Sequence, residues 1–300
     1  MDTGVLLQVL LAGLSTGAVL GLVALGFSLV AGTVRVFSFA HGDVVVAAVF
    51  TGVLVAVGRT PVAQRLGPGA SVLLLVTVLV SGALLSALIA LVLVRPGRHP
   101  LGWVAGGVAA GLLVRAVLGL VFPEQGYAVP DALRLNDLAS DGLLHLPGDS
   151  TLPVRTLGVL VVGAAVGVLA ERYLVRSRFG HSLRAVADDP DAAVLCGINP
   201  GRVLLLAFAA AGALAGLAGL LDAPSHAVSV DDGVVLGLEG IAAAVLGGLG
   251  SLRGALLGGL LVGLAQAVAV HVGGAALQDI TPLGALVVLL ALRPEGLLHR

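Results

Sequence analysis

Hydrophobic residues occur along this chain in long runs that are separated by short polar stretches. A transmembrane helix needs about 20 largely apolar residues, with about 17 as the lower limit. Most of the runs reach that length, so the pattern predicts an all-α, polytopic membrane helix bundle with about eight spanning helices. The runs cover residues 5–31, 43–57, 69–94, 101–122, 153–175, 203–221, 234–250, 254–272 and 281–292.

Three of these runs depart from a simple span. Runs 43–57 and 281–292 are short, and run 234–250 contains Glu239. Irregular backbone at membrane depth is tolerated only where it is buried in protein or lines a water-filled path. We therefore expect a re-entrant or broken-helix element among these three runs.

The composition supports a membrane protein. The 300 residues are 58% hydrophobic and 11% charged, with a mean hydropathy of +1.10, whereas about a quarter of the residues in a soluble domain are charged. No linker or change in composition marks a second domain, so residues 1–300 are expected to form a single transmembrane domain. Gly13, Gly17 and Gly21 share one face of the first run, which favours close packing of helices.

The most polar stretch of the chain, residues 171–202, lies between two long apolar runs and contains five arginines and four acids. Ser182 is predicted to N-cap one short helix. Asp189 is predicted to cap a second helix with Pro190 in its first position, and Gly197 to end it in a left-handed conformation. The Asn-Pro pair that follows repeats the cap signal for the next apolar run. These features indicate two short helices at the membrane surface, which form a docking element.

The placement of arginine predicts the orientation in the membrane, because cytoplasmic loops carry an excess of basic residues. With residues 171–202 inside, the acidic loops 123–152 and 222–233 fall outside, as does the N-terminus. The C-terminus falls inside if the seventh run crosses. Arg59 and Arg65 are exceptions, since they fall on the outer side. The other arginines that fall inside are Arg35, Arg95, Arg98, Arg253, Arg293 and Arg300.

A second polar segment, residues 35–43, separates the first two runs and reads RVFSFAHGD. Its polar groups are costly at membrane depth unless they are paired or face water. We interpret Phe39, His41, Gly42 and Asp43 as part of a broken helix beside the permeation route, with Gly42 in a turn and Asp43 at the start of the next helix. The alternative is an ordinary cytoplasmic loop with Asp43 as a helix cap.

Two charged residues lie inside apolar runs. Arg115 interrupts LLVRAVLGLVF and Glu239 interrupts VVLGLEGIAAAVLGG, and insertion scales assign such residues a cost of roughly 2.5–3.5 kcal/mol. Pairing with each other or with a partner chain would lower this cost, as would a position nearer the membrane interface. Gln266 and His271 are expected to be packing or interfacial residues.

Several functional classes are disfavoured. All 16 basic residues are arginine, so a phosphate-binding P-loop, which needs lysine, is absent, and any ATP hydrolysis must occur on another polypeptide. The net charge of −1 and the lack of a basic, aromatic-rich patch argue against nucleic-acid binding. There is no serine elbow and no paired-histidine metal motif. We therefore expect neither an enzyme nor a bound cofactor or metal.

Four segments, spread over most of the chain, match a known pattern. They read GLVALGFSLVAGTVRVFSFAHGDVV, RFGHSLRAVADDPDAAVLCGINPGRV, AAAVLGGLGSLRGALLGGLLVGLAQA and ALRPEGLL. Together and in this order they resemble the branched-chain amino-acid (LIV-type) ABC-transporter permease family, in particular its first permease subunit. Ser38 stands where the family usually has Asn, and Arg253 stands where Pro is common.

The second segment is similar to the family's loop that inserts into the ATP-binding subunit. Its Asp191-Ala192-Ala193, followed by Gly197, resembles an EAA-type signature with Asp in place of Glu. By this resemblance the cytoplasmic loop 176–202 couples ATP-driven closure to the membrane helices. The implied coupling residues are Arg184, Asp188, Asp191, Ala192, Ala193 and Gly197.

The resemblance also implies the assembly and its task. A permease of this family works in the bacterial plasma (inner) membrane with a second related permease subunit, two cytoplasmic ATP-binding cassette subunits and an extracytoplasmic solute-binding protein. Branched-chain amino acids are the implied solutes, and close relatives handle urea, short-chain amides and other small polar solutes. Phe39, His41, Gly42, Asp43 and Glu239 would lie near the translocation pathway.

An ion-coupled secondary transporter is the alternative function. Such a protein needs no ATPase, and it is expected to show an ion-coupling carboxylate or an inverted repeat. Glu239 would supply the carboxylate, but no repeat is evident in the sequence. Glu239 also departs from the basic or neutral residue that the permease family often has at this position.

Overall fold

The computed structural model describes residues 3–34, 38–58, 66–93, 100–123, 126–135, 143–145, 151–278 and 280–292. Helices account for most of these residues, and a single two-stranded antiparallel sheet joins β1 to β2. The helices and strands are α1 (Thr3–Val34), α2 (Ala40–Val57), α3 (Pro68–Leu93), α4 (Pro100–Val121), β1 (Leu143–His145), β2 (Thr151–Pro153), α5 (Val154–Arg176), α6 (Arg178–Asp188), α7 (Pro190–Leu195), α8 (Pro200–Asp222), η2 (Ala223–Ser225), α9 (Asp232–Gly247), α10 (Leu252–Gly273), η3 (Ala275–Leu277) and α11 (Ile280–Leu292).

Seven helices in the described part of the chain are long and apolar enough to span a membrane, namely α1, α2, α3, α4, α5, α8 and α10. This confirms the predicted all-α, polytopic membrane bundle. Of the three doubtful runs, α2 has 18 residues and qualifies as a span. The other two form α9, with 16 residues, and α11, with 13, and both are shorter than the lower limit of about 17 for a spanning helix.

The first helix forms the centre of the bundle. It packs against α10, α8, α5 and α9, and its consecutive residues Leu22, Val23, Ala24 and Leu25 are all fully buried. A helix that is apolar on every side is suited to such a position. In contrast, only 17% of the α4 span is buried, so α4 lies at the periphery, where its remaining apolar surface suits contact with lipid.

Close contact between α1 and α10 depends on glycine. A Cβ atom on Gly17 would lie 2.7 Å from the Cα atom of Leu260, and Gly259 and Gly263 meet the α1 backbone in the same way. The two helices therefore touch backbone to backbone, as small-residue faces allow. The glycine face that was predicted for the first run is thus an internal packing surface.

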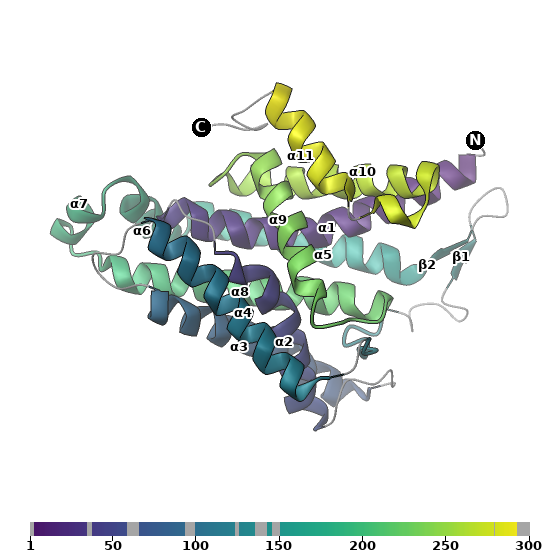
Figure 1. The fold of residues 1–300 in the computed structure, drawn as a ribbon, viewed down its shortest axis with the longest axis horizontal. Helices are drawn as coiled ribbons and strands as arrows, with labels where there is room; N and C mark the ends of the chain where they lie inside the picture. The colour runs from purple at the N-terminus through teal and green to yellow at the C-terminus, as the bar shows by residue number, and fades with distance from the viewer. Residues whose placement is uncertain are drawn as a thin grey trace.

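The expected inner and outer segments lie at opposite ends of the molecule. Figure 1 shows the N-terminus beside β1 and β2 at one end, and α6 and α7 at the other. The two sets of segments can therefore lie on opposite sides of a membrane, and which side is the inner one stays a prediction. The arginines at positions 35, 59, 65, 95, 98, 293 and 300 lie outside the described residues, so the structure does not bear on their placement.

At the end that carries the N-terminus, two connecting segments are tied together. Tyr127 and Val228 form an antiparallel bridge in which each backbone N–H donates to the other residue's carbonyl, at 2.8 and 2.9 Å. This bridge joins the α4–α5 connection to the α8–α9 connection. The described part of the predicted outer loop is therefore anchored over the bundle.

Candidate functional site

The short helix α6 begins one turn earlier than predicted. Its N-cap is Ser177, whose hydroxyl accepts a hydrogen bond from the Gly180 N–H at 3.1 Å. The prediction that Ser182 is the cap was wrong, because Ser182 lies inside the helix and its hydroxyl donates to the carbonyl of Arg178 at 3.0 Å. Both serines precede a helical sequence. However, α5 ends at Arg176 and Ser177 has an extended backbone, so the next helix begins directly after Ser177.

The helix α7 forms as its sequence signals predict. The Asp189 carboxylate accepts hydrogen bonds from the N–H groups of Asp191 and Ala192, at 2.9 and 3.0 Å, and Pro190 occupies the first position. Gly197 is left-handed with φ of 80°. The next cap is also confirmed, since the Asn199 side chain accepts from the N–H of Arg202 at 3.1 Å.

Together, α6 and α7 present an exposed tip above a buried base. Leu183, Val186 and Ala193 are buried against the bundle, while Val194 and Leu195 are exposed, Leu195 to 90%. Of the other predicted coupling residues, Arg184 is partly buried, and Asp188, Asp191, Ala192 and Gly197 are exposed. Val194 and Leu195 therefore form a small apolar tip on an otherwise polar surface segment.

The polar segment after α1 enters α2 directly. The backbone N–H of His41 donates to the Ser38 carbonyl at 3.1 Å, and α2 begins at Ala40. The prediction of a turn at Gly42 and a helix start at Asp43 was therefore wrong, because both residues lie in the first turn of α2. His41 is buried and packs edge-on against Phe27 of α1, with ring centroids 4.6 Å apart.

Asp43 is paired across the bundle with Arg115. An Nη atom of Arg115 lies 2.8 Å from an Asp43 carboxylate oxygen, and Asp231 lies 4.0 Å from the same guanidinium. Gly111 provides the space, because a Cβ there would overlap the Asp43 carboxylate. The counter-charge of Arg115 is thus an acid on α2, which lowers the cost of both charges within the bundle.

The helices α2 and α9 approach each other closely at this level. Gly42 meets the backbone of Gly233 and Gly237, and any Cβ at Gly42 would overlap them. A cleft of about 240 Å³ opens beside this contact, and Phe39, Asp43, Arg115 and Leu238 are among its lining residues. Phe39, Gly42 and Asp43 are therefore brought together on one side of α9.

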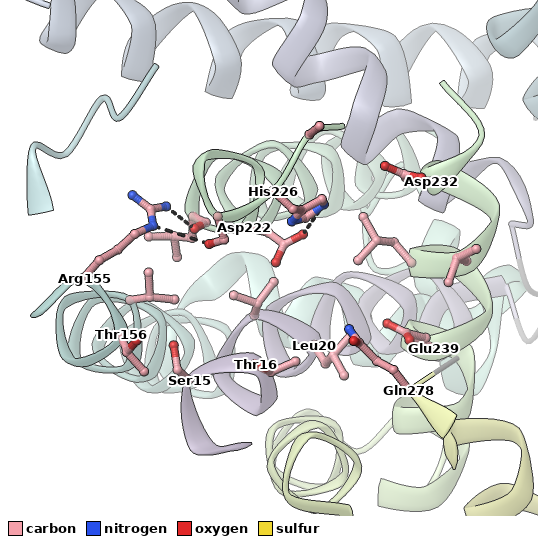
Figure 2. A pocket seen from close by; sticks show the side chains of 17 residues that line it. Ser15, Thr16, Leu20, Arg155, Thr156, Asp222, His226, Asp232, Glu239 and Gln278 are labelled. Atoms are coloured by element: carbon pink, nitrogen blue, oxygen red, sulfur yellow. Dashed lines mark hydrogen bonds and ion pairs between the residues drawn. The ribbon is translucent and has the colours of Figure 1, made fainter. Parts of the chain in front are cut away.

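Glu239 lies on the other side of α9, in a larger cavity of about 530 Å³. Figure 2 shows this cavity between α1, α5, the end of α8 and α9, with Arg155 on one side and Glu239 and Gln278 on the other. Its apolar wall includes Val19, Leu20 and Leu236. The polar residues that line it are Ser15, Thr16, Arg155, Thr156, Asp222, Ser225, His226, Asp232, Glu239 and Gln278.

Arg155 makes polar contacts that connect the segments at the outer rim of this cavity. Its guanidinium ion-pairs with Asp131 of the α4–α5 connection at 3.0 Å and donates a hydrogen bond to the carbonyl of Leu221 at 2.6 Å. Asp222 lies 3.7 Å from His226 on the same rim. Arg155 is buried. Its guanidinium links α5 to the α4–α5 connection through Asp131 and to the end of α8 through Leu221.

Glu239 accepts a hydrogen bond from a side chain of α10. The side-chain N–H of Gln266 donates to a Glu239 carboxylate oxygen at 2.6 Å and to the Gln278 carbonyl at 3.2 Å. Glu239 is 7% exposed and Gln266 is 3% exposed. Gln266, which we expected to be a packing or interfacial residue, is buried and also donates a hydrogen bond that orients this carboxylate at the cavity wall.

Four residues of this cavity were not predicted from the sequence, namely Arg155, Asp222, His226 and Asp232. One signal was present for Arg155, because an arginine that follows an outer loop runs against the usual inside bias of basic residues. Nothing in the sequence indicates that the end of α8 and the start of α5 meet. Among the described residues, no group of three or more His, Cys, Asp or Glu side chains is placed to hold a metal ion.

Comparison with known proteins gives a consistent result. The family described as "Branched-chain amino acid transport system / permease component" matches residues 9–292. The high-affinity branched-chain amino acid transport system permease protein BraD of Pseudomonas aeruginosa is 29% identical over 98% of this chain and 96% of its own length. LivH of Salmonella typhimurium, of the same description, is 28% identical over the same shares. The fructose import permease FrcC of Rhizobium meliloti is 33% identical over 46% of this chain and 41% of its own length.

Proposed function

Because this chain belongs to the family of permease components of branched-chain amino acid transport systems, we propose that it is the membrane subunit of an ABC importer. Its solutes in this proposal are branched-chain amino acids or related small polar solutes such as urea and short amides. ATP hydrolysis takes place on separate cytoplasmic ATP-binding cassette subunits. A second related permease subunit and an extracytoplasmic solute-binding protein complete the assembly.

The observation that carries this proposal is the α6–α7 element. It stands at the end of the molecule opposite the N-terminus (Figure 1), is capped at both helix starts, and exposes Leu195 to 90%. A secondary transporter has no need for a rigid, exposed element of this kind. We assign residues 176–202 as the coupling loop, with Arg184, Asp188, Asp191, Ala192, Ala193 and Gly197 as coupling residues.

The mechanism follows from the requirements of accumulation. A permease that merely bound its solute would equilibrate it, so net import needs two conformations that are favoured in turn. In our proposal the ATP-binding subunits push on α7 as they close, and α6 transmits the push to the bundle. In this proposal the contact of α2 with α9 lies beside the pathway. Phe39, Gly42 and Asp43 lie on one side of α9, and Glu239 lies on the other. His41 also lies beside the pathway.

Two substitutions test the coupling role. Asp191→Ala removes an exposed acid from α7, and Gly197→Val strains a residue whose φ is 80°. The measurement is solute uptake per ATP hydrolysed, in proteoliposomes that contain the complete transport system. We expect each substitution to lower this ratio by about fivefold or more, which corresponds to a typical coupling free energy. Gly119→Ala is the matched control, since Gly119 lies on α4 outside the coupling loop, without a positive φ and with no atom within 4 Å of an added Cβ. Normal coupled uptake in both variants would contradict the proposal.

The energy source separates an importer from an ion-coupled transporter. Uptake by the complete system should stop when ATP is depleted inside the vesicles and should continue when an ionophore collapses the ion gradients. Uptake that instead stops with the ionophore and ignores ATP would establish the secondary transporter. The same vesicles serve both measurements, so differences in insertion do not affect the comparison.

A further inference from the structure

A groove lies between α3 and α8, near the point where α3 ends and α8 begins. Farther along, the two helices touch backbone to backbone, since a Cβ atom on Gly82 or Gly212 would overlap the other helix. Toward the end of α3 a groove of about 290 Å³ opens between them. None of its lining residues lines the cavity of Glu239 or the cleft beside Asp43. They are Ala90, Leu91, Asn199, Gly201, Arg202 and Leu205.

This groove lies where both helices reach the edge of their apolar spans. The span of α3 ends at Val92, and the span of α8 begins at Pro200. Leu91 and Arg202 are therefore close to the span ends, at the level of lipid headgroups. Leu205 lies on the same face of α8 as Arg202, one turn farther into the span. The groove is thus polar at the membrane surface and apolar toward the hydrocarbon.

Arg202 is the single charged residue in the lining. Its side chain is exposed, and none of the described acids forms an ion pair with it, whereas Arg115, Arg155 and Arg253 each pair with an acid. A guanidinium has five N–H donors and no acceptor, and it binds phosphate oxygens in a bidentate geometry. The head of the groove therefore suits an anion that carries a phosphate.

The apolar wall distinguishes a lipid from a soluble anion. Leu91 lines the groove and is 61% exposed. Leu88, one turn earlier on the same face of α3, is 59% exposed. An aliphatic chain that follows Leu205, Leu91 and Leu88 removes this apolar surface and its own from water. A free phosphate gains nothing from this wall.

We propose that this groove binds an anionic phospholipid, whose phosphate pairs with Arg202 and whose acyl chain packs against Leu91 and Leu205. In the predicted orientation the lipid belongs to the inner leaflet, where basic pockets between membrane helices bind anionic headgroups. The inference goes beyond the proposed transport function and does not depend on it.

The test titrates lipid into the purified full chain in detergent and counts bound lipids by native mass spectrometry. Phosphatidylglycerol is the anionic probe. Phosphatidylcholine with the same chains is the comparison, because its choline cation cancels the charge of its phosphate. We expect phosphatidylglycerol to bind about fivefold more tightly, which corresponds to one arginine near an anionic headgroup. Equal binding of the two lipids would overturn the proposal.

Substitutions locate the binding. Arg202→Gln removes the charge, and we expect about a fivefold loss of phosphatidylglycerol affinity with little change for phosphatidylcholine. Arg202→Lys keeps the charge and should retain most of the affinity. Arg172→Gln is the matched control, since Arg172 is also exposed but lies on α5 and does not line this groove. An equal loss in the Arg202 and Arg172 variants would show unspecific attraction and overturn the site.

Two further measurements separate the lipid from other occupants. Leu91→Ser changes an exposed residue of the apolar wall, and we expect it to weaken both lipids, because the wall contacts the chain and not the headgroup. Inorganic phosphate should not displace phosphatidylglycerol; displacement would show a site for soluble anions and overturn the lipid assignment. The titration needs neither ATP nor a partner subunit, so failure of the importer proposal leaves this site standing, and the reverse also holds.

Discussion

At the scale of single residues, two buried or partly buried ion pairs join separate segments of the chain. Arg115 on α4 pairs with Asp43 on α2, and Arg155 on α5 pairs with Asp131 of an outer connection. Breaking a buried pair leaves one charge without compensation and destabilises strongly, whereas a well-made pair contributes little net stability. Each pair therefore links segments that lie far apart in the chain, and removing one partner is the costly change.

The Asp43–Arg115 pair gives an asymmetric prediction. Arg115→Met leaves Asp43, whose side chain is 7% exposed, without its main counter-charge, and we expect a loss of about 3 kcal/mol in the free energy of unfolding. Asp43→Asn should cost less, because Arg115 is 26% exposed and retains Asp231 at 4.0 Å. Unfolding in detergent measures both.

The double variant completes this cycle. Its loss should be smaller than the sum of the two single losses, because removing both charges leaves neither unpaired. Asp191→Asn, an exposed acid of α7, is the control and should stay within about 0.5 kcal/mol of the wild type. Additive single effects would show that the two residues act independently.

At the scale of helices, glycines determine which surfaces touch. The α1–α10 contact uses Gly17 and Gly21 on the same face, yet the two positions differ in available space. A Cβ on Gly17 would lie 2.7 Å from backbone, whereas a Cβ on Gly21 would lie 3.4 Å from its nearest neighbour, a normal contact distance. Sequence spacing alone treats these positions as equivalent.

Alanine substitutions at Gly17 and Gly21 should therefore have different effects on stability. We expect Gly17→Ala to destabilise the protein by about 1–3 kcal/mol, because the added methyl group forces two backbones apart. Gly21→Ala should be close to neutral, as should Gly119→Ala on α4, where no atom lies within 4 Å of the added Cβ. Thermal unfolding of the three variants in the same detergent compares them, and equal losses at positions 17 and 21 would refute this packing.

At the scale of the whole molecule, the two ends of the bundle have different characters. One end carries the cavity rim and the tied connections, and the other carries the polar α6–α7 element with its exposed apolar tip. An importer needs this polarity, because solute arrives on one side and ATP is hydrolysed on the other.

The single cysteine tests the orientation without engineering. Cys196 is exposed at the end of α7, so a membrane-impermeant maleimide should label it in inside-out vesicles and should not label it in intact cells. Cys196→Ser, which removes the thiol, is the control for background. Labelling in intact cells would place α7 outside and exclude contact with cytoplasmic ATP-binding subunits.

Local signals in the sequence were sufficient for much of this molecule. Long apolar runs cannot satisfy their backbone in a membrane except as helices, so the bundle followed from hydropathy. Asp189, Pro190 and Gly197 determined α7, because caps and left-handed stops act within a few residues. Where two local signals compete, as at Ser177 and Ser182, the sequence did not decide between them.

Only the tertiary structure decided which distant residues share a site. The pairing of Asp43 with Arg115, the contact of Gln266 with Glu239, and the junction of Arg155 with Asp131 and Leu221 all join segments that lie far apart in the chain. Such contacts depend on how the helices pack against one another. The sequence therefore determined the helices and their caps, whereas packing placed the charges of the cavity.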